Sequence, residues 1–381
     1  MKADDSQKCV QELVSFLGKI APYDFAEDWD NVGLICGNPQ DLIQGIVISV
    51  NLCAEALEAA KKLGYNVVVC HHPPIFKPVH SVTKLNLPNV FDAIKNGISV
   101  ICLHTNFDLS SEDLSRELSQ KIGFEFEDFL ALRNGIPPSI QQAKFITYVP
   151  ENAVDVVREA VCRAGAGKIG AYNNCSFSWD GEGTFFGGQE TKPTVGTAGK
   201  LERVKERRLE VVFPLALQEK ILEAAKKSHP YEEMAYDIIR LEKPAQKIGY
   251  GFVATRPEHL KHSSFILNFQ NFVDSVKQVF GLRSVTIAGV SQCFEGDLKK
   301  IAFSPGSGSG FVNAAVAQGV QVYVCGEVGY HQMLEAKQRG LALVLLGHSY
   351  SEKYFVESLA KWCFNVTNCI LKVFENIQEV A

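Results

Sequence analysis

The chain has 381 residues, of which 46% are hydrophobic and 21% charged, and a formal net charge of −5, so we expect a globular protein of two or three domains without a general attraction for nucleic acid. No apolar run approaches the ~18 residues that cross a bilayer, and the polar, acidic start lacks the apolar core of a signal peptide. The eleven cysteines form no C-x-x-C pair and several lie in strand-like runs, which indicates buried thiols in a reducing compartment, for which we expect the cytoplasm.

The first 140 residues alternate between strand and helix patterns. An amphipathic helix is predicted from Ser6 to Ile20, and the loop "APYDFAEDWDNVGL" follows it. Strand-to-helix alternation predicts a parallel sheet that is covered by helices on both faces. The predicted strands are 45–51, 66–70 and 98–104, and the predicted helices between and after them are 54–64, 87–97 and 111–123.

Residues 141–247 have a different pattern, β-α-β-β-α-β, which is typical of a ferredoxin-like α+β domain. Its flanks, "RNGIPPS" and "EKPAQKIG", have the composition of linkers. We therefore predict an insert. Its elements are a strand at 144–150, a helix at 153–167, a glycine-rich strand segment at 175–188, a strand at 206–214, a helix at 216–228 and a strand at 235–243.

The last third, 248–381, returns to the α/β pattern. "GYNVVVCHHPP" aligns with "GVQVYVCGEVG", a weak sign of an internal duplication. We predict one α/β domain whose lobes span 1–140 and 248–381, interrupted by the insert. The strands of the second lobe are 299–306, 320–325, 341–348 and 369–374, and its helices are 311–319, 331–340 and 351–364.

Metal-ligating residue types follow three of the predicted parallel strands. His71 and His72 follow "NVVVC" and precede two prolines, so their side chains diverge from extended backbone. Alone, the pair is equally consistent with a polar turn. Asp108 follows the next strand, and His348 and Glu352 follow the strand "LALVLLGH" with a spacing that allows one helix face.

Three imidazoles and two carboxylates are too many donors for one open catalytic ion and suit two. A glutamate can bridge ions ~3.5–4 Å apart. Mixed nitrogen and oxygen ligands favour Zn, Mn, Fe, Co or Ni, and no thiolate narrows the choice. We therefore predict a site for two divalent ions.

Further polar residues lie near the same strand ends. Glu327 and His331 are four residues apart and either assist the site or cap a helix. His104 either orients Asp108 or contacts substrate, or it packs beneath the sheet. These three residues are the candidates for supporting roles.

Two other segments have a possible binding role. "SPGSGSGF", residues 304–311, either cradles phosphate with backbone amides or is a plain loop. "SHPYEE" contains His229, Glu232 and Glu233, which form either a ligand cluster or part of the insert's structure.

The segments "EDWDNVGL", "CHHPPIF", "HTNFD" and "GHSYSEKYF" resemble the signature segments of the dinuclear-metal-centre hexamer family, also called Nif-three-like proteins or GTP cyclohydrolase type 2 homologues. The middle segments "ITYVPENAVDVVREAVCRAGAG" and "SHPYEEMAYDI" resemble the PII/CutA-like insert of its longer members. The resemblance spans essentially the whole chain.

This resemblance implies two divalent ions per chain and a toroidal homohexamer. His72 and Asp108 would serve one ion, His71 and His348 the other, and Glu352 would bridge them. Each of these five ligand positions is occupied in this chain by the residue type that the family uses.

Two functions are expected. The family name and the two-metal chemistry favour a hydrolase that acts on a nucleotide or phosphoester through a metal-bridging water. The alternative is a metal-trafficking or regulatory binding protein without turnover. The departures at Asn51, where the family commonly has an acid, and at Glu327, where it commonly has Asp, concern the substrate pocket rather than the ligands.

Overall fold

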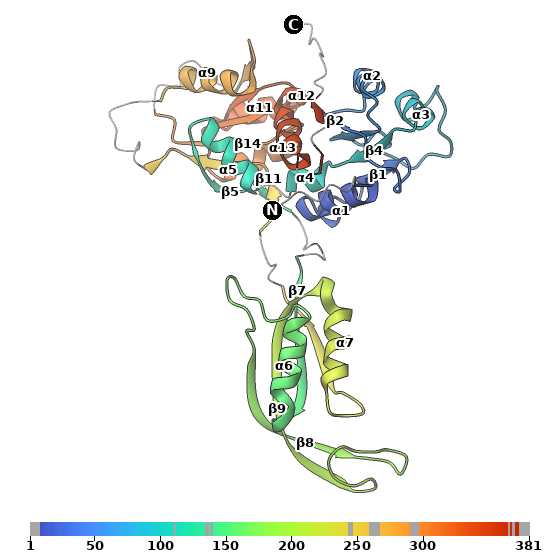
Figure 1. Cartoon of the computed structure of the whole chain (residues 1–381). Coiled ribbons are helices and arrows are strands. Elements are labelled where there is room, and N and C mark those ends of the chain that lie inside the picture. Colours follow the sequence, from blue (N-terminus) through green and yellow to red (C-terminus); the bar gives the residue numbers. More distant parts are fainter. Residues whose placement is uncertain are drawn as a thin grey trace. The chain divides into compact units, whose positions relative to one another are not determined.

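The computed structural model (Figure 1) describes residues 8–109, 112–133, 137, 140–242, 247–258, 267–289, 297–364, 366–367 and 370–372. The predicted helix start at Ser6 and most of the two predicted linkers lie outside these residues. The chain forms two compact units, and most contacts between residues lie within one unit or the other. We call Met1–Arg133 with Ile248–Ala381 the main unit, and Asn134–Lys247 the insert unit.

The first sheet of the main unit has the order β1-β4-β3-β2-β17. Strands β2, β3 and β4 are parallel, β17 is parallel to β2, and β1 is antiparallel to β4. The strands are β1 (Gly33–Cys36), β2 (Ile46–Ser49), β3 (Val67–Cys70), β4 (Ser99–Cys102) and β17 (Ile370–Lys372).

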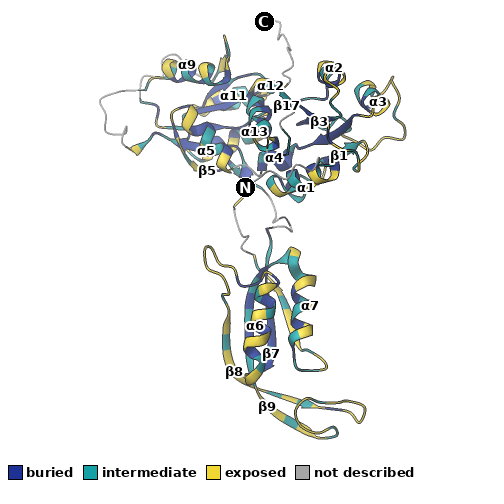
Figure 2. Cartoon of the chain, in the orientation of Figure 1, coloured by how far each residue is buried: buried dark blue, intermediate teal, exposed yellow. Residues whose placement is uncertain are grey.

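Every residue of β2, β3 and β4 is buried because helices cover both faces of this sheet. Val69 packs against α1 (Val10–Ile20) and α13 (Lys353–Cys363) in one core. Val68 faces the opposite core, which includes α2 (Ala54–Leu63) and α3 (Pro88–Lys95). Figure 2 shows the buried strands lying between more exposed helices.

The second sheet of the main unit repeats this design. Its middle strands β14, β15 and β16 are parallel, and β15 lies between its two neighbours as β3 does in the first sheet. This equivalence agrees with the sequence likeness of "GYNVVVC" and "GVQVYVC". The order is β13 (Thr286–Ala288), β16 (Ala342–Leu345), β15 (Val322–Cys325), β14 (Lys300–Phe303), β12 (Phe252–Thr255) and β5 (Glu125–Asp128).

Helices cover both faces of the second sheet as well. One core includes residues of α5 (Glu112–Lys121) and α9 (Phe269–Phe280). The opposite core includes residues of α10 (Val312–Ala317) and α11 (Tyr330–Gln338). No helix in the part of the chain that the structure describes is both long and apolar enough to span a membrane.

The two sheets exchange strands, which the sequence pattern did not predict. Strand β5 comes from the first third of the chain yet pairs with β12 in the second sheet. Strand β17 comes from the end of the chain yet pairs with β2 in the first sheet. The pattern also gave no prediction for β1, β12, α9 or β13, which are short strands and one helix in segments without long apolar runs.

The insert unit has the predicted element order. Its four-stranded antiparallel sheet is ordered β10-β7-β9-β8, and α6 and α7 share one core with it. Strand β9 begins earlier than predicted. The elements are β7 (Gln142–Pro150), α6 (Val154–Arg163), β8 (Phe177–Phe186), β9 (Leu201–Pro214), α7 (Gln218–Ser228) and β10 (Tyr236–Arg240).

Candidate metal centre

The five predicted donors meet at the carboxyl ends of parallel strands in the main unit. His71 and His72 directly follow β3, and Asp108 lies in α4 (Thr105–Leu109), shortly after β4. His348 begins α12 (His348–Ser351) after β16, and Glu352 separates α12 from α13. Open α/β sheets place their ligand sites at such strand ends.

The side chains of the two adjacent histidines are oriented by hydrogen bonds to residues that follow the two strands on either side of β3. His71 is 1% exposed, and its Nδ1 donates to the carbonyl of Leu103, beyond β4, at 2.9 Å. His72 Nδ1 donates to Asn51 Oδ1, beyond β2, at 2.6 Å. Each imidazole therefore has its proton on Nδ1, where it is used in a hydrogen bond, and the Nε2 atom of each ring is left as a potential metal ligand.

Glu352 is 4% exposed and lies between the imidazoles. Its Oε1 is 3.1 Å from His348 Nε2 and 3.8 Å from His71 Nε2. Its Oε2 is 3.3 Å from His72 Nε2 but accepts no hydrogen bond of good geometry. Oε1 thus faces His348 and His71, and Oε2 faces His72.

Two further contacts join donors that the resemblance allots to different ions. His72 Nε2 lies 3.3 Å from His348 Nε2, and His71 Nε2 lies 3.8 Å from Asp108 Oδ2. These contacts agree with the divergence of the two histidines, because His71 is hydrogen-bonded on the β4 side, where α4 carries Asp108, and His72 on the β2 side.

Burial and charge perturb the donors strongly. Burial lowers the pKa of the His71 imidazole to about 3. Burial, and then the negative charge of Glu352, raise the pKa of the Asp108 carboxyl well above its ordinary value. The hydrogen bond with Glu352 raises the pKa of His348 to about 9 against the effect of burial.

Glu352 itself shows the opposite balance. Burial by itself raises the pKa of its carboxyl, but the hydrogen bond from His348 and the nearby imidazoles of His72 and His71 outweigh burial and leave the pKa below its ordinary value. A buried carboxylate that faces Nε2 atoms needs protons or cations between the two.

The donor set fits metal binding. His72, His348 and Glu352 offer ligand atoms that all lie within 4.8 Å of one another. His71, His72 and His104 form a second such group, with His72 common to both. Imidazole nitrogens beside a buried carboxylate oxygen that has no hydrogen-bond partner are the chemistry that divalent transition metals prefer.

His104 is held by a residue that the sequence analysis did not single out. Its Nδ1 donates to Asp30 Oδ1 at 2.9 Å, and the side chain of Asp30 is fully buried. Burial raises the pKa of Asp30, yet hydrogen bonds from His104 and Thr105 outweigh it and leave the pKa at about 2. Asp30 thus fixes the imidazole of His104 beside those of His71 and His72, with ring centroids 5.1 and 5.5 Å away.

The other two candidates for supporting roles, Glu327 and His331, differ in whether they contact the centre. Glu327 Oε1 lies 3.1 Å from His348 Nδ1 and accepts its proton, so all three donor imidazoles are oriented through Nδ1. His331 is exposed on α11 and its ring lies against Tyr330. No hydrogen bond, ion pair or ring contact joins His331 to the five donors in the described part of the chain.

The "SPGSGSGF" loop contacts the centre through Gly306. This glycine has φ +58°, and a Cβ placed on it would lie 2.6 Å from Glu352 Oε1. Its backbone N–H donates to the hydroxyl of Ser351 at 2.8 Å. The loop packs against the buried carboxylate of Glu352, and the spacing of its glycines alone did not indicate this role.

An exposed aromatic pair borders the centre. Trp29 is 55% exposed and Phe76 is 48% exposed, and their ring centroids are 5.5 Å apart. Trp29 also meets the edge of the His104 ring at 6.1 Å. Both aromatics belong to segments, "EDWDNVGL" and "CHHPPIF", that carry the family resemblance.

"SHPYEE" lies in the insert unit, where His229 is structural. Its Nε2 donates to the carbonyl of Tyr148 at 3.0 Å, and its Nδ1 accepts from the backbone N–H of Tyr231 at 3.1 Å. Both ring nitrogens are therefore used within the insert unit, and neither is available as a ligand.

The chain resembles known proteins along nearly its whole length. The family model for Duf34/NIF3 (NGG1p interacting factor 3) matches residues 9–373. A Bacillus subtilis (strain 168) protein named GTP cyclohydrolase 1 type 2 homolog is 31% identical over 360 residues, which cover 94% of this chain and 92% of that protein. A Mycobacterium leprae (strain TN) protein of the same name is 32% identical over 347 residues, which cover 90% and 86%. The crystal structure of a Bacillus cereus protein related to NIF3 has a TM-score of 0.78 and 27% identity and covers 98% of both chains.

Proposed function

The chain belongs to the Duf34/NIF3 family, and on that premise we propose that it binds two divalent metal ions and hydrolyses a nucleotide or phosphoester. The observation that carries the proposal is Glu352, a buried carboxylate whose two oxygens face different imidazoles and whose Oε2 accepts no hydrogen bond. A bridging carboxylate is a common feature of two-metal sites.

His72 and Asp108 would hold one ion, His71 and His348 the other, and Glu352 both, as the family resemblance implies. Glu352 supports this allotment, because its Oε1 faces His71 and His348 and its Oε2 faces His72. When bound, the ions supply Lewis acidity and lower the pKa of water toward neutrality. The three imidazoles are oriented by hydrogen bonds from their Nδ1 atoms, which Leu103, Asn51 and Glu327 accept.

The aromatic pair supports a nucleotide as the substrate rather than a simple phosphoester. Trp29 and Phe76 expose ring faces beside His104, and planar bases stack on such faces. His104, with its orientation fixed by Asp30, would contact the bound substrate between the ring platform and the ions.

A metal-trafficking or regulatory role is the second candidate. The side chain of His348 is 36% exposed and that of Glu327 is 60% exposed, so this part of the centre is open to solvent and to ion exchange. A carrier would release its ions to a chelator within minutes, whereas a hydrolase would retain them through many turnovers.

The test joins metal analysis to a hydrolase screen of the purified full chain. We expect about two ions per chain in the wild type and fewer in Glu352→Gln, because one carboxylate serves both ions. Glu335→Gln, on the exposed face of α11 beside Arg339, is the matched control and should keep both ions. Wild-type metal content in Glu352→Gln would contradict the bridging role.

The hydrolase screen separates the two candidate functions. Nucleotides and simple phosphoesters are tested with the wild type beside His72→Ala. Turnover that is lost in His72→Ala supports the hydrolase. A metal-loaded wild type without turnover on any of these substrates favours the trafficking role.

The assembly is proposed to be a ring-shaped homohexamer with a PII/CutA-like insert that spans 141–247 between lobes 1–140 and 248–381. Strands β8 and β10 are the edges of the insert sheet, and Phe177 and Phe186 on β8 are 65% and 66% exposed. Exposed edges invite pairing. Light scattering on dilution tests this, and a monomer at micromolar concentration would refute it.

The cytoplasm is the proposed location. The cysteines of the described residues are free thiols, and Cys70, Cys102, Cys325 and Cys363 are buried. Such thiols are typical of proteins in a reducing compartment.

A further inference from the structure

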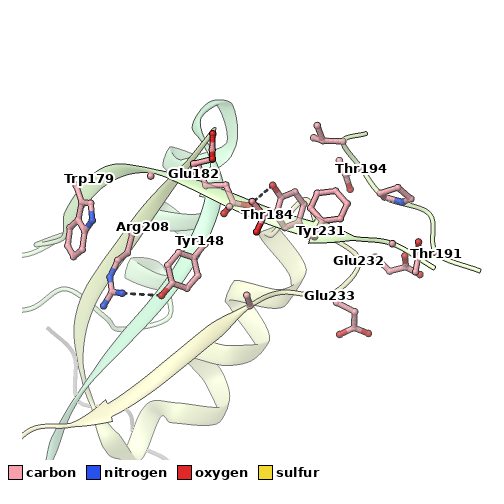
Figure 3. A pocket seen from close by; sticks show the side chains of 18 residues that line it. Tyr148, Trp179, Glu182, Thr184, Thr191, Thr194, Arg208, Tyr231, Glu232 and Glu233 are labelled. Atoms are coloured by element: carbon pink, nitrogen blue, oxygen red, sulfur yellow. Dashed lines mark hydrogen bonds between the residues drawn. The ribbon is translucent and has the colours of Figure 1, made fainter. Parts of the chain in front are cut away.

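The insert unit contains a cavity of about 650 Å³, which we call the insert pocket (Figure 3). Its walls come from Tyr148 at the end of β7, from β8 and β9, from the loop at 187–195 and from the segment at 231–235. Small-molecule sites typically have volumes of roughly 300–1,000 Å³. The insert pocket therefore has the size of a ligand site, and it lies wholly within the insert unit.

Aromatic side chains line the insert pocket. Tyr148, Trp179, Phe185 and Tyr231 contribute to its walls. The ring of Trp179 is 43% exposed, and the guanidinium of Arg208 lies over it at 4.9 Å from the ring centroid. Exposed indole and phenol faces attract organic cations and the apolar chains that carry them.

The charged groups of the insert pocket are predominantly acidic. Four glutamates and one arginine line it, an excess of three negative charges. The positive charge of the arginine, Arg208, is already paired with the carboxylate of Glu210, which accepts a hydrogen bond from Nε and lies 2.9 Å from Nη2. The Nη1 of Arg208 donates a hydrogen bond to Tyr148 Oη. The insert pocket therefore offers no unpaired cation to an anionic ligand.

Three of the four glutamates have no cationic partner among the described residues. Glu182 forms an ion pair with Arg203. Glu206 accepts from the hydroxyl of Tyr231 at 2.7 Å, and Glu232 accepts from the backbone N–H of Lys192 at 3.2 Å. Neither these two carboxylates nor that of Glu233 forms an ion pair with a lysine or arginine of the described residues.

We infer that the insert pocket binds a small organic cation, an amine carried on an aliphatic chain. Glu206 and Glu232 receive the ammonium groups, since charge-assisted hydrogen bonds to carboxylates are strong. Trp179 and Tyr231 cover the aliphatic part and contact the charge through their ring faces. Nucleotides and phosphate esters are excluded by the same acidic lining.

The test uses the full chain with spermidine as the probe at physiological ionic strength, where weak surface attraction is screened. Trp179 is one of three tryptophans in the chain, and the other two, Trp29 and Trp362, lie in the main unit. Calorimetry should find one saturable site per chain, and the accompanying fluorescence change should disappear in Trp179→Phe.

A double variant tests the acidic lining. In Glu206→Gln/Glu232→Gln the amide oxygens still accept from Tyr231 and Lys192, so the fold is kept while two charges are removed. Spermidine affinity should fall at least about tenfold. Glu219→Gln, on the exposed start of α7 and outside the insert pocket, is the matched control and should bind like the wild type.

Four results would overturn the inference. They are the absence of saturable spermidine binding, equal affinity in the double variant, binding of GMP in place of spermidine, and protection of Trp179 from acrylamide quenching by a second copy of the chain that fills the insert pocket. Metal content and hydrolysis are measured separately in the same variants, so failure here is distinct from failure of the metal-centre proposal.

Discussion

Gly306 leaves room for the buried carboxylate of Glu352 at the candidate metal centre. It adopts φ +58°, and its missing side chain leaves room for Glu352 Oε1. Any larger residue would have to displace either the loop or the carboxylate. The candidate centre therefore depends on the missing side chain of Gly306 as well as on the five donor residues.

Gly306→Ala should lose metal beyond what backbone strain explains. The left-handed conformation costs alanine about 1 kcal/mol, and the new Cβ also meets Glu352 Oε1. Gly64→Ala is the control, because Gly64 has φ +70° and no atom within 4 Å of an added Cβ. We expect comparable small losses of melting temperature but reduced metal content only in Gly306→Ala. Equal metal contents would show that the loop yields without moving Glu352.

Trp29 should contribute to ring recognition and not to metal binding. We expect Trp29→Ala to weaken GMP binding about tenfold or more, since stacking is worth about 1–3 kcal/mol per base, and to leave ribose 5-phosphate binding unchanged. Trp179→Ala, in the insert unit, is the control. Calorimetry on metal-loaded protein measures both ligands, and equal losses for GMP and ribose 5-phosphate would refute stacking.

At the scale of elements, β17 completes the sheet that carries the histidines. It pairs in parallel with β2 along Ile370–Lys372, and Ile370 packs against the core shared by α1 and α13. Without β17, β2 becomes the edge of a parallel sheet, and such sheets are stable mainly when they are covered.

Ending the chain at Thr367 should therefore expose β2. Hydrogen exchange at Ile46–Ser49 should become faster, while exchange at Val322–Cys325 in the second sheet should stay as in the wild type. A chain that ends at Lys372 is the matched control, because it keeps β17. Unchanged protection of β2 in the shorter chain would mean that the pairing contributes little to stability.

At the scale of the whole molecule, the two ends of the main unit already meet where the insert unit leaves it. Strand β6 (Ala131–Leu132) pairs with β11 (Gly249–Tyr250), and Arg133 N–H donates to the carbonyl of Ile248 at 3.2 Å. A short linker can therefore replace the insert unit without a long loop to close.

Replacing 134–247 with a short glycine-serine linker should leave about two metal ions bound per chain. All five donors lie in the main unit, and the β6–β11 pair holds the cut ends together. Metal analysis and circular dichroism measure the result, and light scattering on the same protein tests whether the insert unit supports assembly. Loss of both fold and metal would show that the main unit depends on the insert unit.

Most helices and strands with long apolar runs can be predicted from local sequence, because burial on both faces requires such runs and glycine and proline end them. Local sequence also indicates the five donors, since strand ends are visible as abrupt changes from apolar to polar residues. Features that depend on contacts between distant segments become visible only in the folded chain. These features are the contacts of His71 with Asp108 and of His72 with His348, the support of His104 by Asp30, the fit of Gly306 to Glu352, and the exchange of β5 and β17 between sheets. Each joins residues that are far apart in the chain, and local sequence patterns carry no information on which distant segment a side chain or strand edge will meet.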